Sequence, residues 1–594
     1  MRKCINHIRS KTSLLLYGKI KVLIFTFTHL LIYSFANAQF YPQHYFQSPL
    51  DTPLYLSAPF GSLRENHFHS GMDIRTYEHE GLPVYAIADG FVSRIKVSPV
   101  GYGRAIYIEH PNGYTSVYGH LQKYEGEIAS YIKKYQYQNE TFDFDHFPER
   151  NKIPVKKGQI IGWSGNSGGS TGPHLHFEIR NSKSEEPLNP QLFGIRGVDF
   201  MDPKIKKILI YNLDENRPLL VKRFSVSKKN STKTDSVLIY NDTIELANGP
   251  IGMGVEAYDY MTDEEHEYSL YGMEMSVDDK EFFNYRIDRI DFENTRCVNV
   301  HIDYELYKKD EIRFQKCFLD DGNSIKIYNY LRNKGKYLLN DESVHKISVS
   351  VCDISGHSES FSFFIKGKSE GFTRERRKNS CASATLYPRK DNIFKRENLI
   401  LEVPSKALYD TLELCFDILK EKEKNSLSPV YKIHDQFTPL HKSFTISIKP
   451  ENIPEHLSDK LLIAYFQKEG HINSAGGNYS NGYVTARSNS FGNYFVTFDT
   501  IAPTIKPVNI SKEGNIKDTV GVHFKVDDNL SGIATYRGTI NGKWILMEYD
   551  PKNDLLIYAF DEKTVFNQKL DFILIVTDKK GNTTKWRKEL IFKK

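Results

Sequence analysis

Apolar and polar residues alternate in short runs along most of the chain, and Gly, Pro and Asn-Gly signals separate these runs. Such alternation is typical of β-strands, because successive side chains of a strand point to opposite faces of its sheet. Residues 81–121 form one series of this kind and predict an antiparallel meander. Similar runs continue from residue 199 to the C-terminus without a sustained helical period. The pattern therefore predicts an all-β protein built from antiparallel sheets.

Helical periodicity interrupts this pattern within residues 122–153. Ile128, Ile132 and Tyr135 are spaced at i, i+4 and i+7, which predicts a short helix. A polar and aromatic stretch follows, so we interpret residues 122–153 as an insertion between two groups of strands. The insertion leaves the chain just after His120 and ends before the strands that lead to His174. We expect it to form a rim of the cleft near these histidines, and a plain surface insertion is the alternative.

A separate apolar run lies near the N-terminus. Residues 1–21 carry six basic and no acidic side chains, a run of 14 mostly apolar residues follows, and Ala36-Asn37-Ala38 closes it. A transmembrane helix needs about 20 apolar residues, so a signal peptide over residues 1–38 is favoured over a membrane anchor. The mature chain is then expected to be exported to the periplasm, the cell surface or the medium, with no transmembrane segment.

The net charge bears on the expected binding partner, and the cysteines bear on metal binding and disulfide formation. Removing the six basic residues of the signal from the formal charge of +5 leaves the mature chain near −1, so a nucleic-acid partner is not expected. Five cysteines follow the signal, and none has a short metal-binding spacing. Free buried thiols are the favoured interpretation, with a Cys297–Cys317 bridge as the alternative in an oxidising compartment.

Two histidines stand at the start of an apolar run in residues 165–180, GNSGGSTGPHLHFEIR. If this run is a strand, His174 and His176 share one face, and Leu175 and Phe177 share the other. The Gly and Ser residues before them predict a turn without bulky side chains, which leaves open space in front of the two imidazoles.

Further candidates precede this strand. His69 and Asp73 are four residues apart, and Gly71 between them allows the backbone to come close to a bound ion. His120 ends the last run of the predicted meander. Three other histidines are interpreted as structural or merely exposed: His67, His79 and His110.

The segments HFHSGMDI, GLPVYAIADGFV, YGHL and VKKGQIIGWSGNSGGSTGPHLHFEIR, in this order, resemble the M23 peptidase family, the lysostaphin and LytM type of zinc endopeptidase. The resemblance covers most of residues 55–195. It implies that His69, Asp73 and His176 ligate Zn²⁺, that His120 and His174 are catalytic, and that the substrate is the peptide part of peptidoglycan. Because the predicted insertion departs from this pattern, it leaves the shape of the active-site rim open.

The residue types agree with this chemistry. Two imidazoles and a carboxylate form a three-ligand zinc site with an open position, which is the catalytic pattern. The sequence has no HExxH motif, so histidines near their usual pKa would serve as acid and base.

Two alternative protein classes share part of this pattern. Biotinyl and lipoyl carrier barrels have similar turns, but the lysine-bearing hairpin tip that they need is missing. A noncatalytic M23-type protein that binds the wall and regulates another hydrolase is the second alternative.

The strand pattern divides the chain into five parts after the signal. We expect an M23 domain at 39–198, an immunoglobulin-like β-sandwich at 203–368, a linker at 369–392, a β-sandwich module at 393–499 and a second immunoglobulin-like sandwich at 500–594. Residues 346–365 and 571–592 share a layout of strand, Asp, two residues, Gly and strand, which indicates an internal repeat. Asp353 and Asp578 are expected to cap these turns, and calcium binding is the alternative.

Overall fold

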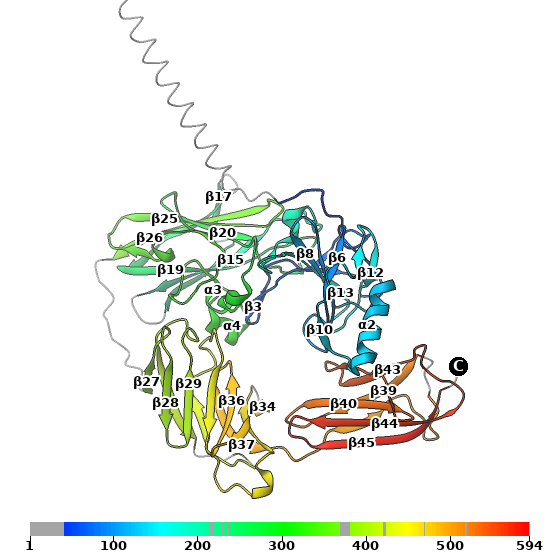
Figure 1. The fold of residues 1–594 in the computed structure, drawn as a ribbon. Helices are drawn as coiled ribbons and strands as arrows, with labels where there is room; N and C mark the ends of the chain where they lie inside the picture. Colours follow the sequence, from blue (N-terminus) through cyan, green and yellow to red (C-terminus); the bar gives the residue numbers. More distant parts are fainter. Residues whose placement is uncertain are drawn as a thin grey trace, which may run out of the picture.

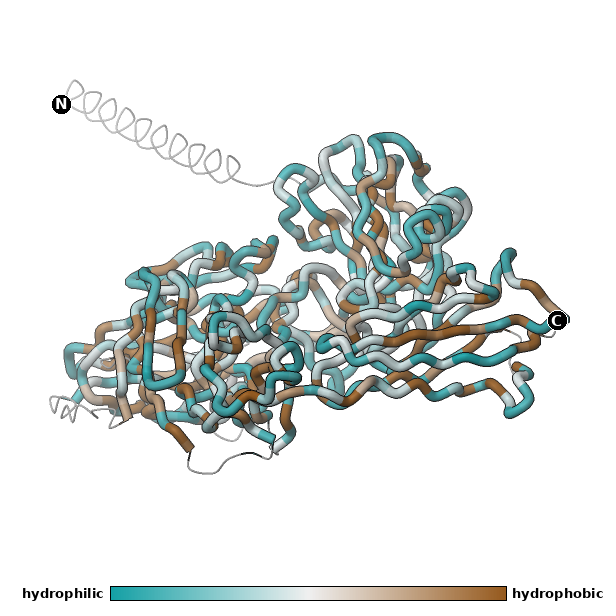
Figure 2. Tube along the Cα trace, turned by 60° about the horizontal axis from the view of Figure 1, so that its bottom comes forward, coloured by the Kyte–Doolittle hydropathy of each residue, from teal (hydrophilic) through white to brown (hydrophobic). Residues whose placement is uncertain are grey.

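The computed structural model describes residues 41–592, apart from residues 214–217, 228–230, 235–236, 369–380, 420–422, 424, 468–469 and 517–519. The predicted signal peptide lies outside the described residues. Among the residues that are described, no helix has the length and apolar character needed to cross a bilayer. Sheets dominate the structure, and Figure 1 shows four β-rich parts arranged in a ring. In Figure 2 hydrophobic and hydrophilic segments alternate along the tube.

The N-terminal domain, residues 41–198, is built on one large sheet that includes the predicted meander. The order of its strands is β1-β4-β13-β8-β7-β6-β10, in which β6, β7 and β8 are consecutive antiparallel neighbours. The bounds are β1 Leu56–Ala58, β4 Met72–Arg75, β13 His174–Asn181, β8 Tyr114–Gly119, β7 Arg104–Glu109, β6 Gly90–Val97 and β10 Phe144–His146. In addition, β11 (Pro154–Val155) pairs with β6 and β14 (Pro187–Leu188) pairs with β13.

Two smaller sheets complete this domain. One contains β5 (Pro83–Tyr85), β12 (Ile160–Trp163) and β9 (Lys123–Tyr124), and the other is the hairpin of β2 (Leu63–Arg64) and β3 (His67–Phe68). The core lies between the sheets, where Leu175 and Phe177 of β13 are fully buried. A short 3-10 helix, η1 (Pro190–Phe193), closes the domain.

The helix predicted within residues 122–153 is present as α2 (Gly126–Asn139). Ile128 and Ile132 bury their side chains in the core of the domain, as their spacing predicts. The expected position at the rim is wrong, because no residue of 122–153, all of which are described, lines the cleft that contains His120 and His174. The apolar face of α2 is committed to the core, so its exposed face is available to contact a different part of the chain.

The first β-sandwich, residues 203–368, consists of two sheets that share one core. One sheet contains β16 (Leu219–Ser225), β15 (Lys204–Asn212), β19 (Gly249–Tyr258), β22 (Gln315–Lys316) and β24 (Tyr337–Leu339). The other contains β17 (Ser231–Thr234), β18 (Val237–Ala247), β26 (Ser358–Lys368), β25 (Val344–Cys352), β20 (Gly272–Val277), β21 (Lys280–Arg286) and β23 (Tyr328–Leu331). Short helices that the strand pattern did not indicate connect these sheets: η2 (Phe292–Cys297), α3 (Val298–His301), α4 (Tyr304–Asp310) and η3 (Arg332–Gly335).

The middle module begins inside the segment expected to be a linker. Strand β27 (Ala382–Leu386) pairs with β30 and therefore belongs to the sheet of this module. Its first sheet contains β27, β30 (Leu412–Leu419), β31 (Val430–Ile433), β37 (Gly492–Phe498), β33 (Leu461–Phe466) and β34 (Ile472–Gly476). Its second contains β28 (Asn392–Arg396), β29 (Leu399–Val403), β32 (Phe444–Ile448), β36 (Tyr483–Ser488) and β35 (Asn478–Ser480), with a 3-10 turn, η4, at Glu455–Leu457.

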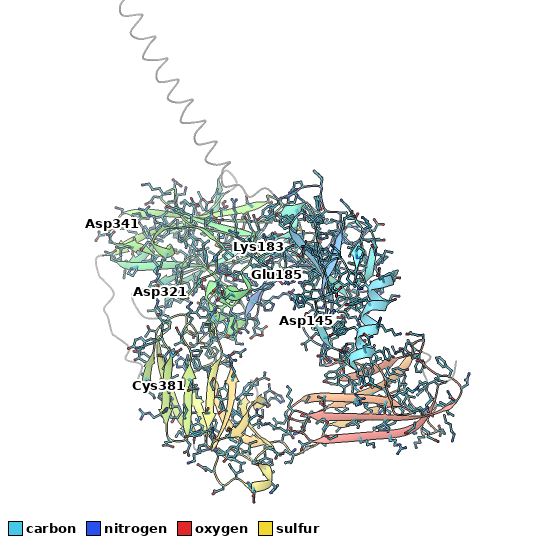
Figure 3. The ribbon with its side chains drawn as sticks, in the orientation of Figure 1. Asp145, Lys183, Glu185, Asp321, Asp341 and Cys381 are labelled. Carbon is cyan, nitrogen blue, oxygen red and sulfur yellow. A yellow bond between two sulfur atoms is a disulfide. The ribbon has the colours of Figure 1, made fainter. Side chains whose placement is uncertain are left out.

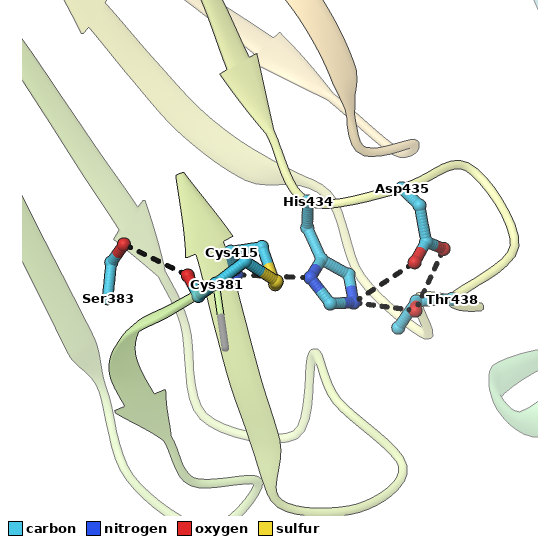
Figure 4. The surroundings of a disulfide bond; sticks show 6 residues. All are labelled: Cys381, Ser383, Cys415, His434, Asp435 and Thr438. Carbon is cyan, nitrogen blue, oxygen red and sulfur yellow. Dashed lines mark hydrogen bonds and ion pairs between the residues drawn. A yellow bond between two sulfur atoms is a disulfide. The ribbon is translucent and has the colours of Figure 1, made fainter. Parts of the chain in front are cut away.

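A disulfide joins Cys381 and Cys415 at the start of this module (Figure 4). The prediction of free thiols is therefore wrong for these two residues, which are 34 positions apart and meet only because β27 pairs with β30. The prediction of free buried thiols is confirmed for Cys297 and Cys317, while Cys352 is free but only partly buried, and the alternative Cys297–Cys317 bridge is absent. A bond between neighbouring strands is consistent with an oxidising compartment.

The last β-sandwich, residues 500–592, has sheets of four strands each. One sheet contains β38 (Thr504–Pro507), β39 (Gly521–Asp527), β43 (Leu555–Ala559) and β42 (Glu548–Asp550). The other contains β41 (Lys543–Trp544), β40 (Ile533–Ile540), β44 (Lys569–Asp578) and β45 (Thr583–Ile591). Asp578 caps its turn by accepting hydrogen bonds from the backbone of Lys580 and Asn582, and Asp353 does the same for Gly356 and His357, as predicted.

The last β-sandwich closes the ring by packing on the N-terminal domain beside α2 (Figure 1). Tyr137 of α2 donates a hydrogen bond of 2.7 Å to Asp561, and its ring lies 5.4 Å from that of Trp544. Glu140 at the end of α2 pairs with Arg537 at 2.6 Å. The exposed face of α2 thus serves as a docking surface for the last module.

Candidate metal centre and active site

Antiparallel pairing of β13 with β4 brings three of the predicted site residues together. His176 lies directly opposite Asp73 in the register, and His69 precedes β4 by three residues. Asp73 Oδ1 lies 3.1 Å from His69 Nε2 and 2.9 Å from His176 Nδ1, and the two imidazole nitrogens are 3.1 Å apart. All three side chains are buried. The expected ligand set therefore converges on one point, although His176 is more than 100 residues from His69 and Asp73 in sequence.

The donor set fits a zinc ion. Tetrahedral zinc with ligands at about 2.0–2.1 Å separates its ligand atoms by about 3.3 Å. The three separations between these donor atoms, from 2.9 to 3.1 Å, are close to that value. Two imidazoles and one carboxylate also leave one tetrahedral position open to the cleft.

Each candidate ligand has an outer partner that orients it. His69 donates its Nδ1–H to Pro59 O at 3.0 Å, which leaves Nε2 for the metal. His176 has the opposite arrangement, because its Nε2–H donates to Glu178 at 2.8 Å and Nδ1 faces the centre. Arg64 donates to Asp73 Oδ2 at 2.8 Å, so Oδ1 is the oxygen directed at the site. Such outer contacts select the tautomer and fix the ring orientation of a metal-ligating histidine.

Glu178 was missed from the sequence, although strand periodicity could have identified it. It lies two residues after His176 on β13 and therefore on the same face. Its carboxylate is completely buried and accepts hydrogen bonds from Ser70 at 2.7 Å, Tyr102 at 2.6 Å and Arg180 at 2.6 Å. Burial raises the pKa of Glu178, but the charge of Arg180 and the contact with His176 outweigh it, so the carboxylate stays ionised.

Electrostatics inside the cluster depend on these pairs. Burial lowers the pKa of His176, but hydrogen bonds with Asp73 and Glu178 outweigh it and raise the pKa to about 9. For Asp73, burial raises the pKa, and the charge of His69 with hydrogen bonds from His174 and His176 holds it well below its usual value. A metal at this centre would displace the proton from His176 Nδ1, while Nε2 keeps its proton for Glu178.

The two predicted catalytic histidines lie side by side at the mouth of the site. The rings of His120 and His174 are 4.7 Å apart, and His174 Nε2 lies 3.4 Å from Asp73 Oδ1. His120 donates its Nδ1–H to Ser167 O at 2.8 Å, and His174 donates its Nδ1–H to Gly172 O at 2.9 Å. His120 therefore keeps Nε2 as a proton acceptor, and Nε2 is the nitrogen of His174 that faces Asp73 Oδ1.

His120 adopts a left-handed backbone conformation with φ of 58°. Non-glycine residues adopt this conformation infrequently, and here it ends strand β8. Burial, followed by the charges of His176 and His174, lowers the pKa of His120 to about 3, so its ring is neutral near pH 7. The strain places this neutral ring against the backbone of Ser167 instead of continuing β8.

The remaining predictions for this domain have clear outcomes. His110 is buried and bonded to Asp89 O and Ser116 Oγ, so it is structural as expected, while His67 and His79 are exposed. Gly71 was predicted to let the backbone approach a bound ion, but in the structure it lets the backbone approach strand β13. A Cβ at this position would lie 2.5 Å from Phe177 O and 2.9 Å from the His176 ring, so glycine permits contact with β13.

A cleft of about 1280 Å³ opens in front of this cluster. All five predicted site residues line it, together with the glycine-rich loop at residues 169–173. Tyr55, Tyr77 and Tyr102 contribute aromatic side chains from the N-terminal domain. Residues of the first β-sandwich line it as well, so the cleft is shared between two parts of the chain.

A family model for Peptidase family M23 matches residues 67–137 and 144–190, which include all five residues of the cluster. Residues 67–190 contain an M23 peptidase domain. A second family model, for a Zu5-like domain, matches residues 383–499 in the middle module.

Curated relatives match about a quarter of the chain or less. The chain is 32% identical over 173 residues to a protein of Haemophilus influenzae named "Uncharacterized metalloprotease", covering 27% of this chain and 31% of that protein. It is 34% identical over 140 residues to the DD-carboxypeptidase/endopeptidase Mpg of Neisseria meningitidis serogroup B, covering 23% and 26%. Lysostaphin of Staphylococcus staphylolyticus is 33% identical over 126 residues, covering 20% and 21%. The chain therefore spans less than a third of the length of each of these relatives.

A solved structure is also similar to the M23 domain. The catalytic domain of lysostaphin from Staphylococcus simulans has 29% sequence identity, with coverage of 24% of this chain and 91% of that chain and a TM-score of 0.18.

Glu178→Gln is expected to weaken zinc binding by about 10–100-fold, because loss of an outer partner of a metal-ligating histidine has effects of this size. The change keeps the shape of the side chain but removes the charge that holds the Nε2–H of His176. Competition with a zinc chelator measures the affinity. The matched control is Glu185→Gln, since exposed Glu185 also contacts Arg180, at 3.4 Å, and is labelled in Figure 3. Equal affinities of the two variants would contradict the role assigned to Glu178.

Proposed function

We propose that this chain is an exported zinc metalloendopeptidase that hydrolyses peptide cross-links or stems of bacterial peptidoglycan. The observation that carries the proposal is the convergence of His69, Asp73 and His176 on one point, with the rings of His120 and His174 beside it in the same cleft. The name of a further relative, the Peptidoglycan DD-endopeptidase ShyA of Vibrio cholerae, supports a peptidoglycan substrate. The predicted signal peptide supports export.

His69, Asp73 and His176 would hold the zinc ion. When bound, zinc lowers the pKa of a coordinated water and polarises the scissile carbonyl. The rings of His120 and His174 lie 4.7 Å apart beside these three residues. One of them accepts the proton from the attacking water, and the other stabilises the oxyanion or protonates the leaving amine. The tyrosines and the loop at 169–173 bound the space in which the peptide lies.

The alternative is a noncatalytic M23-type protein that binds the wall and regulates another hydrolase. Such a protein needs neither a complete donor set nor two oriented bases. Both are present here, with outer partners for each donor, which supports the hydrolase.

Removal of metal is expected to abolish hydrolysis. Purified mature protein incubated with peptidoglycan should reduce turbidity, a chelator should stop the reaction, and added Zn²⁺ should restore it. Mass analysis of the released muropeptides would identify the new amine and carboxyl termini, and hence the bond that is cut. Equal turbidity loss with and without chelator would contradict a zinc-dependent mechanism.

A further inference from the structure

One wall of the candidate cleft belongs to the first β-sandwich. Met261, Thr262, Tyr268, Phe292 and Thr295 line the cleft together with the histidines of the M23 domain. Phe292 is the first residue of η2, and its side chain is 42% exposed. A large exposed aromatic residue inside a cleft is a candidate for contact with a bound molecule.

This wall is held firmly against the M23 domain. Phe60, Leu63 and Phe68, which flank and form the β2–β3 hairpin, bury their side chains in the core of the first β-sandwich. The backbone N–H of Leu63 donates to Ser269 Oγ, and that of Phe68 donates to Thr295 Oγ1, both at 2.9 Å. Because the hairpin leads directly into His69, the two parts share a core at the metal centre. The wall therefore keeps a fixed position relative to the site.

The aromatic residues of the wall bracket the site along β13. Tyr268 accepts a hydrogen bond of 3.0 Å from Arg75, which lies opposite His174 in the register. The ring of Phe292 lies 4.8 Å from the guanidinium of Arg180, six residues further along the same strand. Six residues of strand span about 20 Å, the length of an extended peptide of about six residues. The wall thus runs alongside the path that an extended peptide would take across the site face.

We propose that Phe292 is a specificity-determining residue of the cleft, which packs against the aliphatic part of a peptide held in extended form between the first β-sandwich and β13. This inference rests on the proposed function for the nature of the ligand. Stacking on Arg180 fixes one face of the Phe292 ring, and the exposed remainder of the ring supplies the apolar contact. Specificity at this position then comes from a module outside the M23 domain.

Phe292→Ala in the full chain is expected to raise KM for a soluble peptidoglycan tetrapeptide dimer by about 5–10-fold and to change kcat little, because it removes apolar contact made equally in the bound and transition states. Phe292→Leu should recover part of the loss. The matched control is Tyr330→Ala, since Tyr330 is 43% exposed in the same sandwich but does not line the cleft. Zinc content should be the same in all of these variants.

Binding measured without turnover separates this inference from the proposed function. On a His174→Ala background, calorimetry with the same dimer should show a 5–10-fold higher Kd for Phe292→Ala than for Tyr330→Ala. If the unmodified chain binds but does not hydrolyse the dimer, the peptidase proposal falls and the Phe292 contact stands. The inference is overturned if Phe292→Ala matches Tyr330→Ala in both KM and Kd, if the dimer does not bind, or if Phe292→Ala acts by lowering zinc content.

Discussion

Replacing His174 with alanine is expected to lower kcat/KM for peptidoglycan peptides by about 10²–10⁴-fold, the usual contribution of a positioned acid or base. Zinc content should remain unchanged, because His174 lies 3.4 Å from Asp73 Oδ1 but outside the convergent donor set. His120→Ala should behave in the same way, since the His120 ring lies 4.7 Å from that of His174 and lines the same cleft. Steady-state kinetics and zinc analysis of the same preparations measure both effects.

His79→Ala is the matched control for these two variants, because His79 is exposed and does not line the cleft. It should keep full activity and metal. A noncatalytic regulator would tolerate loss of His120 and His174 as well as loss of His79. Full activity of His174→Ala and His120→Ala in activating another hydrolase, with no turnover by the unmodified chain, would support that alternative and contradict the peptidase.

Asp73→Asn is expected to weaken zinc binding by more than about 100-fold and to remove activity at limiting zinc. Loss of an outer partner alone costs about 10–100-fold, and Asp73 supplies a donor oxygen itself. The substitution keeps the size of the side chain but removes the charge that balances Arg64 and the imidazoles. Zinc titration in the presence of a competing chelator measures the loss, and thermal unfolding reports whether the fold is retained.

The control for this change is Asp145→Asn on β10, labelled in Figure 3. Asp145 pairs with Arg94 at 2.5 Å at the partly exposed edge of the same sheet, and it does not line the cleft. This variant should bind zinc normally. If Asp73→Asn bound zinc as tightly as Asp145→Asn, the carboxylate would not be a ligand and the metal centre would have to be assigned to other residues.

Local sequence patterns were sufficient to predict the strands, the helix α2 and part of the candidate site. Alternation identified the strands, the spacing of Ile128 and Ile132 identified α2, and strand parity placed His174 and His176 on one face of β13. These features depend on residues within a few positions of one another, and the repeat of the backbone fixes the direction of each side chain. The resemblance to the M23 family then supplied the roles of His69, Asp73 and His120.

Other features depended on which segments pair and pack, and no local repeat encodes that choice. The Cys381–Cys415 bond follows from the pairing of β27 with β30, and α2 faces the last β-sandwich instead of the cleft. The register between β4 and β13 places Asp73 opposite His176. The buried carboxylate of Glu178 then forms a hydrogen bond with His176 on the other side of its ring. The wall with Phe292 exists only because the β2–β3 hairpin buries its apolar residues in a neighbouring module.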